Sequence, residues 1–183
     1  VLDRIKRRIV LQHGPLWSWC ERERQKYEPP NRPWASMTKP GSANHCLAFI
    51  SYRCEGGSET ARVISQELRK RGIRTFLDVD DLSSGHFAER LLHEIETIPN
   101  FIVILTPGCL VRCNIESDWL RREIEHAIKT ARNIIPILKD GFNFPVASEL
   151  PPTMAELDKN NWIHYDHVLL ASTIEKLVTF LKR

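Results

Sequence analysis

The stretch SDWLRREIEHA, residues 117–127, joins the signals of a helix start to two side chains that could do chemistry. Ser117 or Asp118 is suited to the amino-terminal cap of a helix. The apolar residues that follow recur at helical spacing and predict one buried stripe: Leu120, Ile124, Ala127 and Ile128. At about 100° per residue, Glu123 falls at the edge of that stripe, with Trp119 one turn earlier on the same flank.

A carboxylate beside an indole at the rim of a core is suited to holding a cationic ligand. The alternative is an ordinary solvated acid next to a half-buried tryptophan, because most helix acids are surface groups. This stretch alone leaves both interpretations of Glu123 and Trp119 open. The elements that surround the stretch must decide between them.

Strands and helices are predicted to alternate along residues 44–183. Buried apolar runs predict strands over residues 45–52, 73–79, 101–106, 133–138 and 162–165. Helical periodicity predicts helices over residues 58–71, 87–95 and 172–181 besides the one that begins near Ser117, with Gly72 ending the first. The order indicates an α/β fold, a five-stranded parallel sheet with helices on both faces, whose function lies at the carboxyl ends of the strands.

Polar residues follow the predicted strands at that edge. They are Ser51, Tyr52 and Arg53 after the first strand, Asp78, Asp80 and Asp81 after the second, Thr106 after the third, and Lys139 and Asp140 after the fourth. Asp78, Thr106 and Lys139 supply the residue types of a phospho-accepting receiver. A receiver also takes acids from the end of its first strand, where this chain has Ser51-Tyr52-Arg53. The sequence also lacks a phosphate-binding glycine loop, a dinucleotide fingerprint and a Gly-x-Ser-x-Gly elbow.

Charge and composition separate residues 1–43 from the rest of the chain. Residues 1–40 hold nine Lys or Arg against four Asp or Glu, whereas the remainder holds seventeen against nineteen. The near-neutral body argues against nucleic-acid binding. Residues 1–43 are predicted to be a basic leader or linker rich in proline and tryptophan, with the spacing of a short amphipathic helix over residues 2–12. A compact domain is expected over residues 44–183.

The five cysteines form no Cys-x-x-Cys pair, and no histidine near Cys109 and Cys113 completes a zinc pattern. Free thiols in a reducing compartment are the simpler interpretation, and we expect no metal and a cytoplasmic protein. The longest apolar run, around residues 101–105, is too short to cross a bilayer, so no transmembrane segment is expected.

Seven motifs in the expected order resemble the successive boxes of a TIR domain. They are FISYR at 49–53, FLDVDDLxxGxF at 76–87, LTPG at 105–108, DWxxxE at 118–123, NIIPI at 133–137, DGFxFP at 140–145 and TIEK at 173–176. The similarity covers residues 44–183 and is greatest to the catalytic, NAD-cleaving branch of the family. It implies a flavodoxin-like fold and cleavage of the bond between nicotinamide and ribose, with NAD as substrate and no further cofactor.

The resemblance also implies roles for individual residues. Glu123 matches the catalytic acid, and Trp119 would stack on the nicotinamide side of the ligand. Tyr52 and Arg53 would face the ribose and the phosphates. Substrate binding is further assigned to Asp78, Leu82, Ser84 and Phe87, through the loop that follows the second strand in TIR domains.

In the family that loop contacts a neighbouring TIR domain, and Gly85 would give it freedom to move. Phe144 and His167 align with the stacking residues of the neighbour; otherwise Phe144 belongs to the core and His167 to the surface. The resemblance therefore implies an NAD glycohydrolase that is activated by TIR self-association in cell-death or immune signalling, with ADP-ribose or a cyclic isomer as product. The alternative is a non-catalytic TIR adaptor that signals through TIR–TIR binding alone.

Overall fold

The computed structural model describes residues 46–77, 87–155 and 157–182. The predicted leader and four of the predicted site residues lie outside these ranges: Asp78, Leu82, Ser84 and Gly85. Phe87 is the first residue of a helix, but its side chain is not described.

Five parallel strands form one sheet in the described part of the chain, in the order β2-β1-β3-β4-β5. The strands are β1 (Ala48–Tyr52), β2 (Thr75–Leu77), β3 (Asn100–Leu105), β4 (Asn133–Leu138) and β5 (Ile163–His164). This strand order is that of the flavodoxin-like folds and confirms the predicted fold class. Ligands in such sheets bind beyond the carboxyl ends of the strands, near the point where the strand order reverses. That point here lies between β1 and β3.

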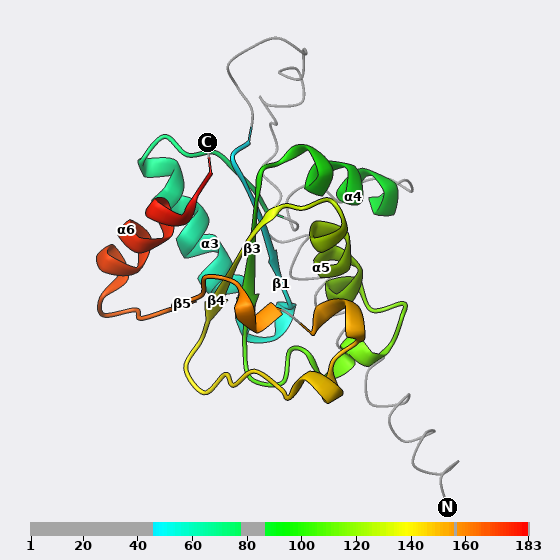
Figure 1. Cartoon of the computed structure of the whole chain (residues 1–183). Helices are drawn as coiled ribbons and strands as arrows, with labels where there is room; N and C mark the ends of the chain where they lie inside the picture. Colours follow the sequence, from blue (N-terminus) through cyan, green and yellow to red (C-terminus); the bar gives the residue numbers. More distant parts are fainter. Residues whose placement is uncertain (1–45, 78–86, 156, 183) are drawn as a thin grey trace, which may run out of the picture. The chain divides into compact units, whose positions relative to one another are not determined.

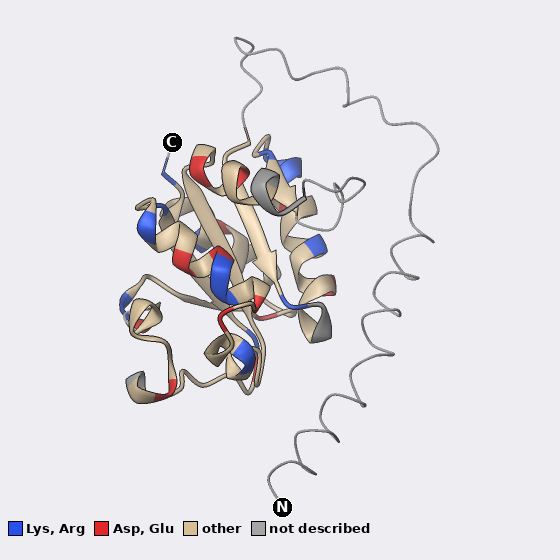
Figure 2. Ribbon diagram, turned by 90° about the vertical axis from the view of Figure 1, so that its right-hand side faces the viewer, with Lys and Arg blue, Asp and Glu red and all other residues tan. Residues whose placement is uncertain are grey.

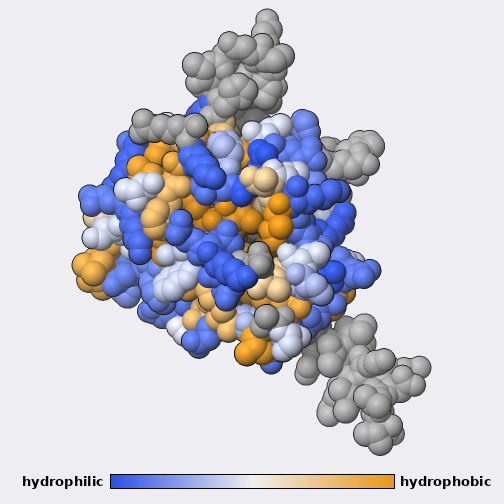
Figure 3. Space-filling model, viewed as in Figure 1, coloured by the Kyte–Doolittle hydropathy of each residue, from blue (hydrophilic) through white to orange (hydrophobic). Residues whose placement is uncertain are grey.

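Helices cover both faces of the sheet (Figure 1). Helices α3 (Cys54–Lys70) and α6 (Leu170–Phe180) lie on one face, and α4 (Phe87–Thr97) and α5 (Trp119–Lys129) lie on the other. Figure 2 shows acidic and basic residues interspersed over the ribbon rather than gathered by sign. Figure 3 shows apolar residues along the middle of the molecule, between more hydrophilic flanks.

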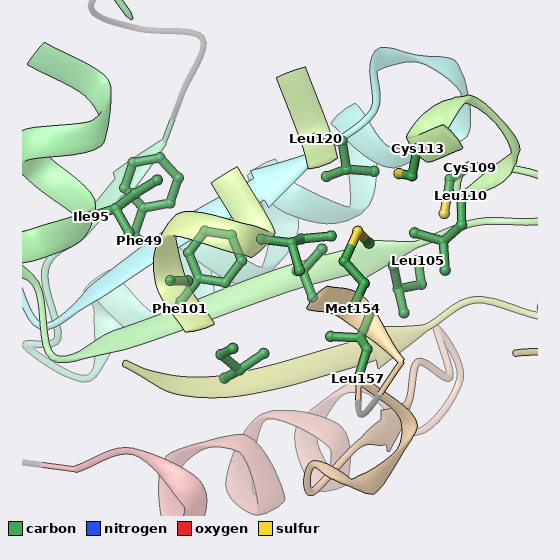
Figure 4. Packing of buried hydrophobic residues seen from close by; sticks show 14 of the residues in the cluster. Phe49, Ile95, Phe101, Leu105, Cys109, Leu110, Cys113, Leu120, Met154 and Leu157 are labelled. Carbon is green, nitrogen blue, oxygen red and sulfur yellow. The ribbon is translucent and has the colours of Figure 1, made fainter. Parts of the chain in front are cut away.

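Each face of the sheet has its own apolar core because successive strand residues point to opposite sides. In β1, Ala48, Ile50 and Tyr52 belong to the core beneath α3 and α6, whereas Phe49 belongs to the core beneath α4 and α5. Figure 4 shows the second core, with Phe49 and Phe101 at one end and the sulfur atoms of two cysteines at the other. Ser51 lies in β1 on the same side as Phe49, facing α5.

The predicted elements are confirmed, and several of their ends differ. Helix α3 begins at Cys54, four residues earlier than predicted. Its first turn includes Gly56 and Gly57, and because glycine is a poor helix former the sequence did not indicate a helix there. Gly72 ends this helix as predicted: its φ is +75°, the N–H of Gly72 donates to Arg69 and the N–H of Ile73 donates to Leu68. The last strand, β5, has two residues rather than four.

Among the described residues, four short 3-10 helices were not predicted. They are η1 (Val111–Asn114), η2 (Ala147–Glu149), η3 (Pro152–Met154) and η4 (Leu157–Lys159). Single turns of this kind carry too little periodicity to be read from a sequence. No helix among the described residues is long and apolar enough to cross a membrane.

Candidate active site

Two contacts join the carboxyl end of β1 to helix α5. Ser51 Oγ donates a hydrogen bond to Glu123 Oε2 over 2.5 Å. Two residues further along the chain, the guanidinium of Arg53 makes a bidentate ion pair with Asp118, at 2.9 and 3.1 Å. Ser51 and Arg53 both reach α5 because alternate residues of an extended chain point to the same side. The two acids of the predicted site motif are therefore held by Ser51, which lies in β1, and by Arg53, which follows the strand directly.

Glu123 is more deeply buried than the sequence predicted. Its exposed fraction is 2%, and it lies among the buried residues of α5 with Leu120 and Ile124. Its place on the helix is the edge of the apolar stripe, as predicted, and the buried surface of α5 extends to include it. Ile128, which was predicted to belong to the stripe, is exposed. The apolar stripe is thus turned toward the side of Glu123.

Ser51 is the partner of Glu123 that sequence reasoning missed. Ser51 was recognised at the end of the first strand, but nothing in its type or position assigned it to the acid. The available signal was the two-residue alternation of β1, which places Ser51 on the side of Phe49 and hence on the side of α5. Only the packing of α5 on that face shows which acid it contacts.

Asp118 is the amino-terminal cap of α5, one of the two alternatives predicted. Its carboxylate accepts a hydrogen bond from the backbone N–H of Arg121 at 3.2 Å. Besides the pair with Arg53, Arg112 Nε lies 3.7 Å away, and the Cys113 thiol donates over 3.8 Å. Asp118 thus fixes the start of the helix that carries Trp119 and Glu123.

Arg53 has a different environment from the one the resemblance implied. Its Nε donates to the backbone carbonyl of Cys109 at 2.9 Å, and its two terminal nitrogens contact Asp118. Burial opposes its charge, but the hydrogen bond and the negative charge of Asp118 hold the pKa of Arg53 above its usual value. The guanidinium therefore ties β1, the turn after β3 and α5 together. The predicted contact with the phosphates would have to share it with Asp118.

Two cysteines line the same end of the core (Figure 4). Burial raises the pKa of the Cys109 thiol, and burial with the nearby charge of Asp118 raises the pKa of Cys113 to about 12. Thiols with raised pKa values are poor nucleophiles, so both cysteines act as small apolar groups here. Both are free, and the described residues contain no cluster of three or more metal-binding side chains.

Trp119, at the start of α5, is half-buried. The guanidinium carbon of Arg122 lies 4.3 Å from the centre of its ring, a cation–π contact. One face of the indole is therefore covered by a cation from the same helix.

Tyr52 lies on the other side of the sheet from Glu123. Its ring belongs to the core beneath α3, and its exposed fraction is 7%. A Cβ atom at Gly57 would come within 3.1 Å of the Tyr52 Cβ, so the close approach of α3 to Tyr52 depends on that glycine. The structure thus brings Ser51, Arg53, Trp119 and Glu123 together and directs Tyr52 away from them.

Phe144 and His167 lie on segments that follow β4 and β5. Phe144 is partly buried and makes an edge-to-face contact with Phe142, with ring centres 5.1 Å apart. It lines an open hollow of about 530 Å³ together with Leu110, Asn114 and Glu149. His167 is exposed. Their predicted roles toward a neighbouring domain stay predictions.

Comparison with known proteins identifies the family. The profile of the TIR domain family matches residues 48–177. The NAD(+) hydrolase SARM1 of Danio rerio is 33% identical over 156 residues, covering 84% of this chain and 21% of that protein. The NAD(+) hydrolase sarm1 of Drosophila melanogaster is 38% identical over 150 residues, covering 80% of this chain and 11% of that protein. This chain therefore spans about a fifth or less of the length of these relatives.

Two solved structures share the fold. The TIR domain of the Toll-related receptor TRR-2 from Hydra magnipapillata superposes with a TM-score of 0.56 at 19% identity, over 74% of this chain and 97% of that one. A TIR-STING receptor from C. gigas superposes with a TM-score of 0.53 at 19% identity, over 78% of this chain and 43% of that one. With the profile match and the seven motifs in order, the comparisons exclude the receiver interpretation, and the chain belongs to the TIR domain family.

Proposed function

We propose that this chain is an NAD glycohydrolase, with the ionised side chain of Glu123 as its catalytic carboxylate. The observation that carries the proposal is the buried carboxylate of Glu123, one helical turn beyond the half-buried Trp119 at the carboxyl edge of the sheet. Relatives named NAD(+) hydrolases, 33% to 38% identical to this chain, support it.

A single carboxylate is sufficient for the proposed reaction. The bond between nicotinamide and the ribose C1′ atom breaks with its electron pair leaving on nicotinamide, which departs as a neutral base and needs no general acid. The ribosyl group then carries positive charge, which an anionic carboxylate stabilises as in glycoside cleavage. Water adds to C1′ and loses a proton, which gives ADP-ribose. If an adenine nitrogen adds in place of water, the product is a cyclic isomer.

The chain would bind NAD as its substrate and need no further cofactor. Trp119 would stack on the nicotinamide ring, and Arg53 would contribute positive charge near the diphosphate while it remains paired with Asp118. We place Asp78, Leu82, Ser84 and Phe87 near the substrate on the resemblance alone. For Tyr52, contact with the ribose requires its ring to leave the core beneath α3.

Activation by self-association is part of the proposal. At 2% exposure, the carboxylate of Glu123 must become accessible before a ribose can contact it. A neighbouring TIR domain that contacts Gly85, Phe144 and His167 would supply the opening step, in cytoplasmic cell-death or immune signalling. We therefore expect the dispersed chain to be slow and the clustered chain to be fast.

The test is NAD consumption by the full chain, dispersed and tethered into clusters, with products separated by chromatography. We expect Glu123→Gln, which keeps the shape of the side chain and removes its charge, to lower nicotinamide release by about a hundredfold or more. Glu125→Gln is the matched control, because Glu125 lies on the same helix but accepts from Arg121 and Thr153 instead. Full activity of Glu123→Gln would overturn the catalytic assignment.

A non-catalytic TIR adaptor is the second candidate. The contact of Arg122 with the ring of Trp119 favours it, since an indole covered by a cation of its own helix would suit a surface that never receives NAD. It predicts no nicotinamide release by the wild-type chain in either state, together with binding to a TIR partner.

A further inference from the structure

Ser51 is a buried polar residue in the middle of a core, and its hydroxyl donates a hydrogen bond to the proposed catalytic carboxylate of Glu123. The other residues of β1 that are fully buried, Ala48, Phe49 and Ile50, are apolar. Ser51 is itself 0% exposed, and a buried hydroxyl lowers stability unless it is hydrogen-bonded. The hydrogen bond to Glu123 meets that requirement, across 72 residues of sequence.

We infer that Ser51 is a positioning residue, whose hydroxyl orients the Glu123 carboxylate and favours its ionised form for cleavage of the nicotinamide–ribose bond. The inference rests on the proposed function. It assigns no contact between Ser51 and NAD. Its effect on the reaction passes through Glu123.

The direction of the hydrogen bond supports this role. Ser51 Oγ donates and Glu123 Oε2 accepts, and a donor to a carboxylate stabilises the charged form. At 2% exposure, Glu123 has little water around it to do the same. A carboxylate that must oppose a positive ribosyl group needs both its charge and a fixed direction, because misplacement of a catalytic group by about 1 Å can cost about a hundredfold in rate.

The surrounding structure lets the hydroxyl be tested by itself. The ion pair of Arg53 with Asp118 holds the end of β1 against the start of α5 independently of Ser51. Removal of one hydroxyl should therefore leave the strand and the helix in place. The Glu123 carboxylate would lose the hydrogen bond that Ser51 donates to it.

Ser51→Thr and Ser51→Val form the decisive pair, because they have the same shape and differ by the hydroxyl. Ser51→Ala removes the hydroxyl without adding atoms and serves if the branched side chains do not fit. Ser65→Ala is the matched control, since Ser65 is also buried and its hydroxyl bonds to Thr75 at 2.7 Å, on the face away from α5. Each variant of the full chain is compared with wild type by thermal unfolding and by kcat and KM for NAD in the clustered state.

We expect Ser51→Val and Ser51→Ala to lower kcat by about tenfold to a hundredfold with KM changed by less than about threefold, as for a group that acts mainly in the transition state. Ser51→Thr should keep kcat within about threefold, and Ser65→Ala should keep both constants. The acidic limb of the kcat–pH profile should move to higher pH in Ser51→Val and stay in Ser65→Ala.

Two negative results are distinguishable. If wild type releases nicotinamide, Glu123→Gln does not, and Ser51→Ala equals Ser65→Ala in kcat and pH profile, the role of Ser51 is overturned and the proposed function stands. If wild type releases no nicotinamide even when clustered, the proposed function falls and the inference falls with it.

Discussion

Asp118 and Glu123 are two buried acids on one helix, and they are stabilised by different kinds of partner. Asp118 receives the guanidinium of Arg53, the N–H of Arg121 and the thiol of Cys113. Glu123 receives the hydroxyl of Ser51. The charge of Asp118 is thus used to hold the structure together.

The first prediction concerns Asp118. Asp118→Ala should lower the free energy of unfolding by about 3 kcal/mol, because it removes a helix cap and leaves the half-buried guanidinium of Arg53 without its carboxylate. Asp118→Asn keeps a capping oxygen and should lose about half as much. Urea unfolding of the two variants beside wild type measures the difference. Equal stability of all three chains would mean that the ion pair contributes nothing to the fold.

At the level of the element, two helices end in the same way with different residues. Two positions past the last helical residue the chain is left-handed in both: Gly72 follows α3 with φ +75°, and Ala131 follows α5 with φ +54°. In both, the N–H of the left-handed residue and the N–H of the next residue donate back into the last turn; those of Ala131 and Arg132 bond to the carbonyls of Ile128 and Ala127. Only glycine adopts this left-handed conformation without a steric cost, so Ala131 carries strain.

The second prediction follows from this pair of helix ends. Ala131→Gly should raise the free energy of unfolding by about 0.5 to 1 kcal/mol, and Gly72→Ala should lower it by about 1 kcal/mol. Gly72 is a clean comparison, because a Cβ added there would meet no atom within 4 Å. Thermal unfolding of the two variants beside wild type shows whether each substitution raises or lowers the stability. A loss of stability in Ala131→Gly would show that the left-handed residue is not strained.

The two helix ends also show what the sequence can and cannot predict. Gly72 marks its helix end by its residue type, and the sequence predicted it. Ala131 carries no such mark, because alanine favours helices. In the same way, Asp118 marks the start of α5, whereas the start of α3 at Cys54 has no capping side chain and was placed four residues too late.

For the candidate site, the sequence predicted the positions of the residues in the fold better than it predicted their surroundings. The spacing of the motif placed Trp119 and Glu123 on one helix, and the order of strands and helices placed them at the carboxyl ends of the strands, as observed. Both features can be read from short stretches of sequence. The burial of Glu123, the hydroxyl of Ser51 and the direction of Tyr52 depend on how α5 and α3 pack on the two faces. Contacts between residues so distant in sequence leave no spacing pattern to read.

Across the whole molecule, Asn100 joins the beginning and the end of the described domain. It is fully buried at the start of β3, and its side-chain nitrogen donates to the carbonyls of Leu47 at 2.7 Å and Lys182 at 2.8 Å. Its oxygen accepts from the N–H of Lys182 and from Asn133, each within hydrogen-bonding distance. Every hydrogen-bonding position of this side chain is therefore used.

The third prediction is that Asn100 is important for stability and unimportant for the chemistry. Asn100→Ala should lower the free energy of unfolding by about 3 kcal/mol, because three partly buried backbone groups, of Leu47 and Lys182, and the Asn133 amide all lose the hydrogen bonds they make to Asn100. Asn100→Asp should be at least as severe, since a carboxylate cannot donate to the two carbonyls. Urea unfolding measures both, and NAD cleavage by the remaining folded protein should be unchanged. A loss of activity without a loss of stability would contradict this role.

The position of Asn100 has a consequence for the two ends of the described domain. The backbone carbonyls of residues 47 and 182 accept hydrogen bonds from the same nitrogen atom, so these two ends lie close together. That point lies at the amino ends of the parallel strands, as Figure 1 shows for the end of the chain, and Glu123 is held at their carboxyl ends. Any segment joined to residues 47 and 182 would therefore attach at the edge of the sheet opposite the one that holds Glu123.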